Sequence, residues 1–358
     1  MKKVCFLVGN LNESGGTERV PTLIANKLVN IGYDVSILNL VDGKDPFFSL
    51  DSKVKNFSLY ERKLSFKKNY LGAIYKIRNF VKEKRITHLI VVDSGNCLFT
   101  IPALAYLDIK HICWEHFNFK NNNGAKQRDW SRILAAKYCD FVITLTNRDK
   151  EFWYQGIKKV KAQIVTIPNP QPYEAVYSYP SKSNKVVLAV GRLLPVKGYN
   201  ILLSAWNQVV KNLPDWQLII VGEGRERSNL TEFINENNLH NNVKLVGNTK
   251  NVTQYYEQAS IYCLSSYYEG FPMVLLEAQA FGLPIVAFDC DTGPSDIVMQ
   301  GVNGLLVPPT DYQKLSESLL KLMSIPTENY NDMVNASKKV AQKFTIDNVI
   351  DAWVNILK

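Results

Sequence analysis

Two glutamates eight positions apart flank the start of an apolar stretch in the second half of the chain. Glu269 precedes Gly270-Phe271-Pro272, and Glu277 lies within the following run of Val, Leu and Ala. A carboxylate buried among apolar side chains is costly unless it accepts hydrogen bonds, and sugar hydroxyls are suitable donors. Pro272 suits the first turn of a helix, whose free N–H groups favour phosphate oxygens. The segment is interpreted as a binding site for a phosphorylated sugar; pairing of Glu277 with an internal Arg or Lys is the alternative.

A pair of cations stands in a loop earlier in the same half. Arg192 and Lys197 lie five positions apart, between a predicted strand and a predicted helix. Arg can bind an anion through two N–H groups, Lys acts as a point charge, and a helix amino terminus adds its own attraction. The loop is predicted to bind a diphosphate, with a solvated basic loop as the alternative. Gly222 and Gly224, after the next strand, would let the backbone approach a base or a ribose.

Two loops of the first half carry further candidates. Gly15 and Gly16 precede a helix and leave backbone amides open to an anion, although the G-x-G-x-x-G fingerprint of dinucleotide binding is missing. Glu115 and His116 end a predicted strand. A histidine in that place can exchange a hydrogen bond with a polar substrate, while Glu115 could equally be its buried partner.

These loops need elements that bring them together. Short runs of Val, Ile and Leu alternate with helical periodicity along the chain, which predicts parallel sheets built from βαβ units. Two such series, separated by a Pro- and Ser-containing stretch, predict an α/β protein of two doubly wound domains. We expect the domains over residues 1–172 and 173–344, with an amphipathic helix in 345–358 returning to the first. Because ligands of such sheets bind at the carboxyl ends of the strands, a site in the cleft between the domains is expected.

The expected strands and helices are short and regularly spaced. The strands are expected at residues 3–9, 34–40, 87–92, 110–114, 140–145, 163–167, 186–190, 217–221, 243–246, 260–264, 284–288 and 305–307. The helices are expected at residues 17–31, 70–84, 126–138, 147–155, 199–211, 226–238, 251–258, 273–281, 311–323, 329–343 and 346–357.

Taken in order, the motifs resemble those of the retaining glycosyltransferases of family 4, which have the GT-B fold of two facing Rossmann-like domains. The resemblance covers essentially the whole chain, and its most specific part is the pattern E-G-F-P-x-V-x-x-E-A that contains Glu269 and Glu277. Its other parts are Gly15-Gly16, Glu115-His116, Gly191-Arg192 with Lys197-Gly198, and Gly222-Glu223-Gly224.

The resemblance implies a role for each of these residues. Arg192 and Lys197 would hold the diphosphate of a nucleotide-sugar and stabilise it as it departs. Glu269 would meet hydroxyls of the donor sugar, Glu277 those of the ribose, and His116 the sugar near its 6-position. The implied catalytic residues are His116, Arg192, Lys197 and Glu269. The implied substrate-binding residues are Gly15, Gly16, Glu115, Gly222, Gly224, Gly270, Phe271, Pro272, Met273, Val274 and Glu277.

The segment around Glu269, together with Thr292-Gly293-Pro294-Ser295-Asp296, is similar to bacterial enzymes that build polyprenyl-diphosphate-linked glycans or other surface polysaccharides. The implied donor is a UDP-hexose or UDP-N-acetylhexosamine, and the implied acceptor is a lipid-linked glycan. No cofactor besides the donor and no metal are expected, and Asp289-Cys290-Asp291 is interpreted as a strand end and turn. The alternatives are an enzyme like UDP-N-acetylglucosamine 2-epimerase on the same fold, and a non-enzymatic polyanion-binding protein.

The net charge of +9 is concentrated in the first half of the chain. Residues 1–180 hold 27 Lys and Arg against 16 Asp and Glu, and residues 53–85 alone hold 11 against two. Aromatic and aliphatic residues lie between these cations, which suits an amphipathic helix on an anionic membrane, where a lipid-linked acceptor would be met. A solvated helix face is the alternative. Nucleic-acid binding is not expected, because no nucleic-acid motif accompanies the charge.

The chain has no apolar run of about 18 residues and no signal peptide pattern. It is therefore predicted to be cytoplasmic and peripheral on the inner face of the cytoplasmic membrane. The six cysteines are expected to be buried apolar side chains. Cys113 and His116 have a zinc-like spacing, but no second ligand pair accompanies them, so no zinc site is expected.

Overall fold

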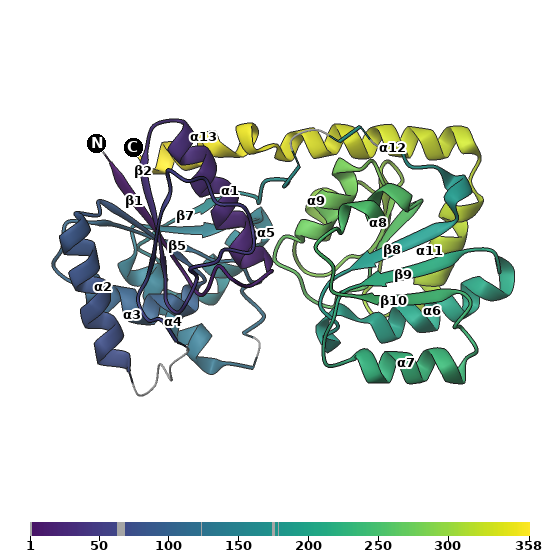
Figure 1. Ribbon diagram of the computed structural model, residues 1–358, viewed down its shortest axis with the longest axis horizontal. Coiled ribbons are helices and arrows are strands. Elements are labelled where there is room, and N and C mark those ends of the chain that lie inside the picture. Colours follow the sequence, from purple (N-terminus) through teal and green to yellow (C-terminus); the bar gives the residue numbers. More distant parts are fainter. Residues whose placement is uncertain (1, 63–68, 123, 174–175, 178) are drawn as a thin grey trace. The chain divides into compact units, whose positions relative to one another are not determined.

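The computed structural model describes residues 2–62, 69–122, 124–173, 176–177 and 179–358 (Figure 1). The chain forms two compact units, each built on one parallel sheet. Unit 1 comprises Met1–Pro170 and Ile346–Lys358, and unit 2 comprises Gln171–Thr345. The first boundary lies between Pro170 and Gln171, whereas the sequence places it between 172 and 173.

The sheet of unit 1 has seven strands among the described residues, in the order β3-β2-β1-β4-β5-β6-β7. Because β1 pairs with both β2 and β4, the strand order reverses beside β1, as in a doubly wound sheet. Most strand side chains are buried, which explains why the strands are nearly continuous runs of Val, Ile and Leu. The strands are β1 (Lys3–Val8), β2 (Asp34–Asn39), β3 (Lys55–Ser58), β4 (His88–Val92), β5 (Lys110–Trp114), β6 (Phe141–Thr144) and β7 (Gln163–Thr166).

Several helices of unit 1 bury one apolar stripe. In the second of them, Ala73, Ile77 and Val81 recur every four residues and are all buried. The helices are α1 (Gly16–Asn30), α2 (Tyr70–Lys84), α3 (Cys97–Leu104), α4 (Lys126–Tyr138), α5 (Asn147–Gly156) and α13 (Ile346–Ile356). The last helix, yellow in Figure 1, packs on α1, and its Trp353 ring lies 4.4 Å from that of Trp114 in β5.

The sheet of unit 2 has six strands among the described residues, in the order β10-β9-β8-β11-β12-β13. Here the order reverses between β8 and β11, which are neighbours in the sheet although far apart in the chain. The strands are β8 (Val186–Val190), β9 (Gln217–Val221), β10 (Val243–Gly247), β11 (Ile261–Leu264), β12 (Ile285–Phe288) and β13 (Gly304–Val307).

The core of unit 2 lies between this sheet and its longer helices. Leu202, Trp206 and Val209 of one helix and Leu315, Leu319 and Leu322 of another pack into it at helical spacing. The helices are α6 (Tyr199–Asn212), α7 (Arg227–Glu236), α8 (Thr253–Gln258), α9 (Met273–Ala280), α10 (Pro294–Ile297), α11 (Tyr312–Ser324) and α12 (Thr327–Ala341). Short 3-10 turns are η1 (Ser94–Asn96), η2 (Lys182–Asn184), η3 (Pro195–Lys197) and η4 (Gln342–Phe344).

The basic segment 53–85 contains two elements. Helix α2 spans the expected residues 70–84, whereas the short edge strand β3 was not expected. Residues 63–68, which include Lys67 and Lys68, lie outside the described residues. None of the helices that the described residues form is long and apolar enough to cross a membrane.

Candidate functional site

The loops that follow β8 and β11 leave the sheet of unit 2 side by side, because these strands are neighbours. The Ser265 hydroxyl donates to the Lys197 carbonyl at 2.8 Å, and the Tyr267 N–H donates to the Val196 carbonyl at 2.8 Å. Gly198 has a φ of +61°, and a Cβ there would lie 2.1 Å from the Ser265 carbonyl oxygen. Only glycine fits that position, so these contacts hold the two loops in one place.

The two loops bring Lys197 and Glu269 together. The Lys197 Nζ lies 2.7 Å from the Glu269 Oε1, and the side chains are 23% and 11% exposed. The loop after β12 joins them, since the Thr292 hydroxyl donates to the Glu269 carbonyl at 2.6 Å. A cation and a carboxylate, each with part of its surface open, therefore stand at the carboxyl ends of three strands.

Arg192 stands in the same loop as Lys197. Its side chain is exposed, and it has no hydrogen-bond or ion-pair partner among the described residues. The next residue, Leu193, is fully buried and fastens the loop to the core. The guanidinium can therefore turn toward an anion at small conformational cost.

Gly222 and Gly224 lie against the backbone of the loop that follows β8. A Cβ on Gly222 would lie 2.0 Å from the Gly191 carbonyl oxygen, and one on Gly224 would lie 2.4 Å from the Leu193 carbonyl oxygen. The space that these glycines leave is filled by the backbone of the loop that carries Arg192. They therefore position that loop, and their contact with a base or a ribose remains a prediction.

The segment from Gly270 to Val274 forms the turn into α9, whose first residue is Met273. Phe271, Pro272 and Met273 are buried, whereas Gly270 and Val274 are partly exposed. The Phe271 ring packs edge-on against Phe344 at 5.4 Å between centroids. These buried side chains anchor the turn, and what the turn can offer a ligand is the backbone at the start of α9.

Glu277 lies inside α9 and is bound by a tyrosine. The Tyr256 hydroxyl donates to the Glu277 Oε2 at 2.6 Å, and the two residues are 0% and 4% exposed respectively. Burial, and then the charge of Glu277, raise the pKa of Tyr256 well above its usual value, so its hydroxyl remains a donor. The hydroxyl of Tyr256 therefore holds one oxygen of Glu277 in place, and the roles given to Glu277 from the sequence remain predictions.

In unit 1 the Glu115 carboxylate is surrounded by donors and is 0% exposed. Its Oε2 accepts from the Ser94 hydroxyl at 2.6 Å and from the Arg132 Nε at 2.9 Å. Its Oε1 accepts from the backbone N–H groups of His116 and Phe117, each at 3.1 Å. Burial alone would raise the pKa of Glu115, but the charges of Arg132 and Arg128 outweigh it and lower that pKa. The carboxylate therefore positions the His116 backbone, and this arrangement does not offer it to a substrate.

Two arginines of α4, four residues apart and hence on one face of the helix, complete this buried network. Arg132 is 1% exposed and also donates to the carbonyls of Asn118, Phe119 and Asn121. Arg128 binds Asp93 through both terminal nitrogens, at 2.8 and 3.0 Å. Neither arginine was predicted from the sequence; their spacing in an otherwise half-buried helix was the available signal.

His116 presents an unpaired ring nitrogen. Its ring lies 4.5 Å from that of Trp114, and its Nε2 is buried without a hydrogen-bond partner among the described residues. Burial lowers the pKa of His116 to about 4, against the opposing charge of Glu115. The imidazole is therefore neutral near pH 7 and can exchange one hydrogen bond with a hydroxyl.

The glycines of the first loop lie at the start of α1. Gly16 is exposed and is the first residue of the helix, and Gly15 is its N-cap. A Cβ on Gly15 would lie 2.3 Å from the Glu18 Oε2, and the Thr17 hydroxyl donates to the other oxygen of Glu18 at 2.7 Å. The chain's own carboxylate thus lies at this helix end, and an incoming anion would have to compete with it.

The chain was compared with known proteins. The sequence model "Glycosyltransferase Family 4" matches residues 14–171, and "Glycosyl transferases group 1" matches residues 178–340. A relative from Haemophilus influenzae, described as an uncharacterized glycosyltransferase, is 38% identical over 357 residues, which cover 100% of both chains. The chain belongs to glycosyltransferase family 4.

Further similarities of the glycosyltransferase extend over its full length. The Campylobacter jejuni GalNAc-α-(1→4)-GalNAc-α-(1→3)-diNAcBac-PP-undecaprenol α-1,4-N-acetyl-D-galactosaminyltransferase is 28% identical over 367 residues, covering 100% of this chain and 98% of the relative. The crystal structure of a variant of S. aureus TarM, in complex with fondaparinux, α-GlcNAc-glycerol and UDP, superimposes with a TM-score of 0.84 at 16% identity, covering 100% of both chains. The two parallel sheets and these neighbours give the protein the GT-B fold.

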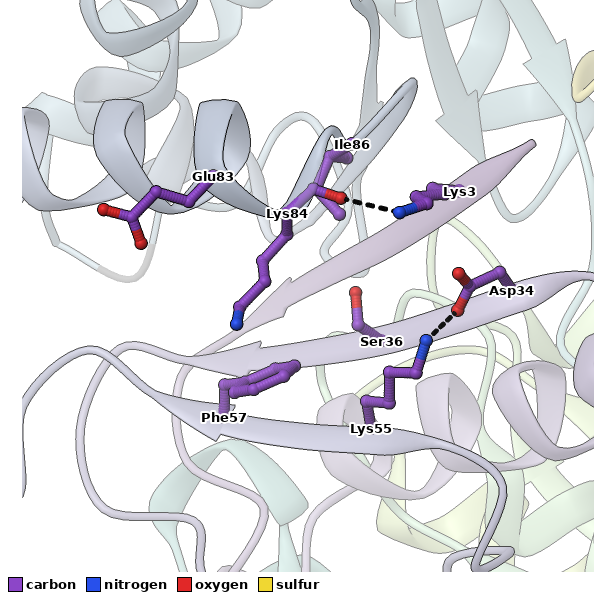
Figure 2. Close-up of a pocket in the computed structure, with 8 residues that line it drawn as sticks. All are labelled: Lys3, Asp34, Ser36, Lys55, Phe57, Glu83, Lys84 and Ile86. Carbon is purple, nitrogen blue, oxygen red and sulfur yellow. Dashed lines mark hydrogen bonds and ion pairs between the residues drawn. The ribbon is translucent and has the colours of Figure 1, made fainter. Parts of the chain in front are cut away.

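A pocket in unit 1 of the glycosyltransferase is separate from the loops that carry the expected site residues (Figure 2). Lys3, Asp34 and Lys55 are the first residues of β1, β2 and β3, so the pocket lies at the amino ends of the strands. Its cations are already engaged: the Lys55 Nζ lies 2.7 Å from the Asp34 Oδ1, and the Lys3 Nζ donates to the Lys84 carbonyl at 3.2 Å. None of the expected site residues lines it.

Replacing Tyr256 by phenylalanine should destabilise unit 2. The change removes the donor to Glu277 and leaves a buried carboxylate with one hydrogen bond fewer, which costs about 1–3 kcal/mol. Urea unfolding monitored by circular dichroism measures the loss. Tyr267→Phe is the matched control, because that hydroxyl donates to Asn200 at 3.2 Å near the surface. Equal stability of the two variants would contradict the role given to Tyr256.

Acidification should destabilise the glycosyltransferase through His116. An unfolded histidine takes up a proton near pH 6.5, whereas folded His116 does so only at about 4. Below pH 6.5 the unfolded chain binds more protons, so the free energy of unfolding falls until the folded pKa is reached. His116→Gln should reduce this dependence by about 1–3 kcal/mol between pH 6.5 and 4.5. His240→Gln, at an exposed position, should leave the slope unchanged; a His116→Gln curve parallel to wild type would refute the assignment.

Proposed function

We propose that the protein is a retaining glycosyltransferase in the synthesis of a bacterial surface glycan. It would move a hexose or N-acetylhexosamine from a UDP-sugar to a lipid-linked glycan acceptor. The observation that carries this is the Lys197–Glu269 pair, 2.7 Å apart, beside the exposed Arg192 at the strand order reversal of unit 2. Cations for a diphosphate and a carboxylate for sugar hydroxyls stand together there. Unit 2 would bind the nucleotide-sugar, and unit 1 the acceptor.

The proposed reaction breaks the bond between the sugar C1 and the diphosphate oxygen. The acceptor oxygen bonds to C1 on the same face, and its proton passes to the departing phosphate oxygen. Arg192, Lys197 and the N–H groups at the start of α9 would take up the charge that develops on the diphosphate. Glu269 would accept hydrogen bonds from the sugar and Glu277 from the ribose, with Tyr256 holding the Glu277 carboxylate. No step in this proposal uses a metal.

The proposed substrates are suggested by those of related proteins. The S. aureus TarM variant was crystallised with UDP, and the C. jejuni relative is named for transfer to an undecaprenyl-diphosphate-linked glycan. The first supports a UDP-sugar donor here, and the second supports a polyprenyl-linked acceptor. The neutral His116, with its unpaired Nε2, would meet a hydroxyl of the donor sugar.

Release of UDP tests the proposal. The purified protein would be incubated with a panel of UDP-hexoses and UDP-N-acetylhexosamines, each with and without undecaprenyl-diphosphate-linked glycans. UDP release that requires an acceptor, with a product of retained α configuration by NMR, is the expected result. Consumption of UDP-N-acetylglucosamine without an acceptor would favour an epimerase instead, and an inverted product would refute retention.

A peripheral membrane location is part of the proposal, and one face of unit 1 supports it. In α2, Leu71 and Tyr75 are 77% and 66% exposed, and in α4, Trp130 and Ile133 are 67% and 45% exposed. Helix α3 contacts both of these helices. Exposing large apolar side chains to water costs free energy, and such exposed side chains are typical of helices that lie in a membrane interface.

Cations extend this exposed apolar face at helical spacing. In α2, Arg78 and Lys82 follow Leu71 and Tyr75. In α4, Lys126 and Lys137 stand on either side of Trp130 and Ile133 in the sequence. Successive residues of each set are three or four positions apart, so each set lies on one face of its helix. The charges suit anionic lipid headgroups.

Flotation with liposomes tests the membrane proposal. The double variant Tyr75→Ser, Trp130→Ser should lose most of its binding to anionic vesicles, because each exposed aromatic contributes its buried area to the interface. Tyr312→Ser, 37% exposed in unit 2, is the control. Unchanged flotation of the double variant, or equal binding of wild type to vesicles without anionic lipid, would contradict the proposal.

A further inference from the structure

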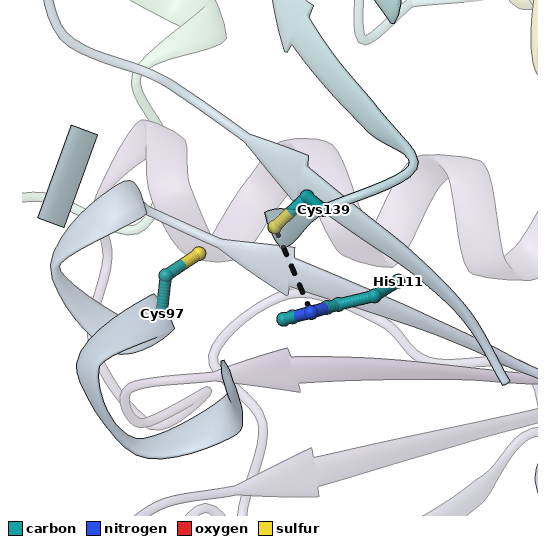
Figure 3. A group of neighbouring side chains, drawn as sticks. All are labelled: Cys97, His111 and Cys139. Atoms are coloured by element: carbon teal, nitrogen blue, oxygen red, sulfur yellow. Dashed lines mark hydrogen bonds between the residues drawn. The ribbon is translucent and has the colours of Figure 1, made fainter. Parts of the chain in front are cut away.

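Three buried side chains of unit 1 meet away from the sugar-transfer site (Figure 3). Cys97 begins α3, His111 lies in β5, and Cys139 follows α4. One ligand atom from each lies within 4.8 Å of the other two, and the Cys139 Sγ lies 3.6 Å from the His111 Nδ1. The three residues are 0%, 5% and 5% exposed. Two thiols and an imidazole are the donor types that bind Zn²⁺ in structural sites.

We propose that Cys97, His111 and Cys139 bind a structural zinc ion that ties together α3, β5 and the end of α4. In tetrahedral coordination, a Zn–S bond of about 2.3 Å and a Zn–N bond of about 2.0 Å place sulfur and nitrogen about 3.5 Å apart. The observed separation of 3.6 Å between Cys139 and His111 meets this requirement. The Cys97 sulfur lies within 4.8 Å of both of these atoms and completes a triangle of ligand atoms.

The second ring nitrogen of His111 has the partner that a zinc-bound histidine needs. Thr100 Oγ1 lies 2.9 Å from the His111 Nε2, so the Nε2 can carry the proton and the Nδ1 can face the metal. A hydrogen bond of this kind holds the tautomer and the ring orientation of a ligating histidine. Thr100 lies three residues after Cys97 in the same helix, so α3 supplies both a ligand and the group that orients another.

Cys113 stands beside this cluster as the candidate for a fourth ligand. It lies two residues after His111 in β5, and therefore on the same face of the sheet, but its sulfur is not among the atoms that lie within 4.8 Å of one another, so it would have to move closer to bind the ion. Three thiolates and one imidazole are a known structural zinc set. This assignment departs from the expectation of no zinc site, which considered only the spacing of Cys113 and His116. The ligands come from three separate elements, and no motif in the sequence would join them.

Burial suits zinc better than it suits an ionised thiol. Free charges at 0–5% exposure would be costly, but Zn²⁺ with two thiolates is neutral and with three carries one negative charge. Metal binding therefore removes most of the cost of deprotonating these cysteines.

Metal analysis of the intact protein tests the proposal independently of sugar transfer. Chain purified from zinc-containing medium should hold about one zinc ion per chain by mass spectrometry, and a mercurial thiol reagent should release it. Protein produced with Co²⁺ instead should show thiolate-to-cobalt charge transfer and tetrahedral ligand-field bands. Folded, active protein that contains no stoichiometric zinc, and that refolds without taking up Zn²⁺ or Co²⁺, would overturn the proposal.

Variants locate the metal. Cys97→Ser and Cys139→Ser should each lower the zinc content at least tenfold, whereas Cys263→Ser, which changes a buried free thiol of unit 2, should leave it unchanged. If the Cys97 and Cys139 variants do not fold, the cobalt spectrum of the wild-type chain still reports whether thiolates are bound. Full zinc content in either folded variant, or loss of zinc from Cys263→Ser, would place the metal elsewhere and overturn the assignment.

Discussion

Replacing Lys197 by alanine should lower kcat/KM for sugar transfer by about 10²–10³-fold, the size of effect seen when a group that stabilises developing charge is removed from an active site. The Lys197 Nζ is the cation nearest the Glu269 carboxylate, at 2.7 Å, and stands where the departing diphosphate would lie. Loss of a charge that stabilises the leaving group lowers kcat together with kcat/KM. Initial rates of UDP release over a range of donor concentrations measure both constants.

The control is Lys185→Ala. Lys185 is also in unit 2 and pairs with a carboxylate, Asp215, but at the surface, where both side chains are about half exposed or more. This variant should transfer sugar at the wild-type rate, because exposed ion pairs contribute little. Wild-type activity of Lys197→Ala would refute the site.

A double-mutant cycle separates two roles for Glu269. If its carboxylate serves only to hold Lys197, then Glu269→Gln should add little to Lys197→Ala, because groups that act as a unit are not additive. If the carboxylate also binds sugar hydroxyls, as proposed, the double variant should lose activity beyond either single variant. Additive losses therefore support direct contact with the donor.

The sheets could be predicted closely from the sequence because their strands are buried on both faces. Each of the twelve expected strands begins and ends within one residue of a strand in the structure, from Lys3–Val8 to Gly304–Val307. Parallel strands covered by helices must be apolar along their whole length, and that is the strongest local signal a sequence carries.

Elements without that burial could not be predicted. Strand β3 is short and mostly half exposed at the edge of its sheet, so its residues Lys55–Ser58 carry no apolar run. Helix α3 is apolar on every side and contains Pro102, so it shows no helical periodicity. In both cases tertiary packing decides the conformation, and the local pattern does not.

The site residues were predictable as positions but not as partners. Lys197 and Glu269 are 72 residues apart, and the sequence named both without indicating that they pair. Gly222 and Gly224 were recognised as special, yet the backbone that they admit belongs to a loop about 30 residues earlier. Such contacts depend on the order of strands in the sheet, which the sequence does not state.

Replacing Glu115 by alanine should reduce the free energy of unfolding by about 3–5 kcal/mol, the usual cost of leaving one member of a buried ion pair alone. Arg132 would remain 1% exposed with its Nε no longer facing a carboxylate, and the N–H groups of His116 and Phe117 would lose their acceptor. Urea unfolding measures the loss, and the transition of unit 1 should shift while that of unit 2 stays in place if the units unfold separately.

Asp129→Ala is the matched control, because that carboxylate also faces Arg132, at 4.0 Å, but is 51% exposed. It should cost less than about 1 kcal/mol. A second variant, Glu115→Gln, keeps the shape and one acceptor oxygen but replaces the other oxygen by an NH₂ donor and removes the charge. Its loss of stability should fall between those of Asp129→Ala and Glu115→Ala. The comparison also decides between the two roles considered for Glu115. A substrate-binding carboxylate would raise the KM for donor or acceptor in Glu115→Gln and leave unfolding unchanged, whereas a positioning carboxylate lowers stability first and affects transfer only through His116.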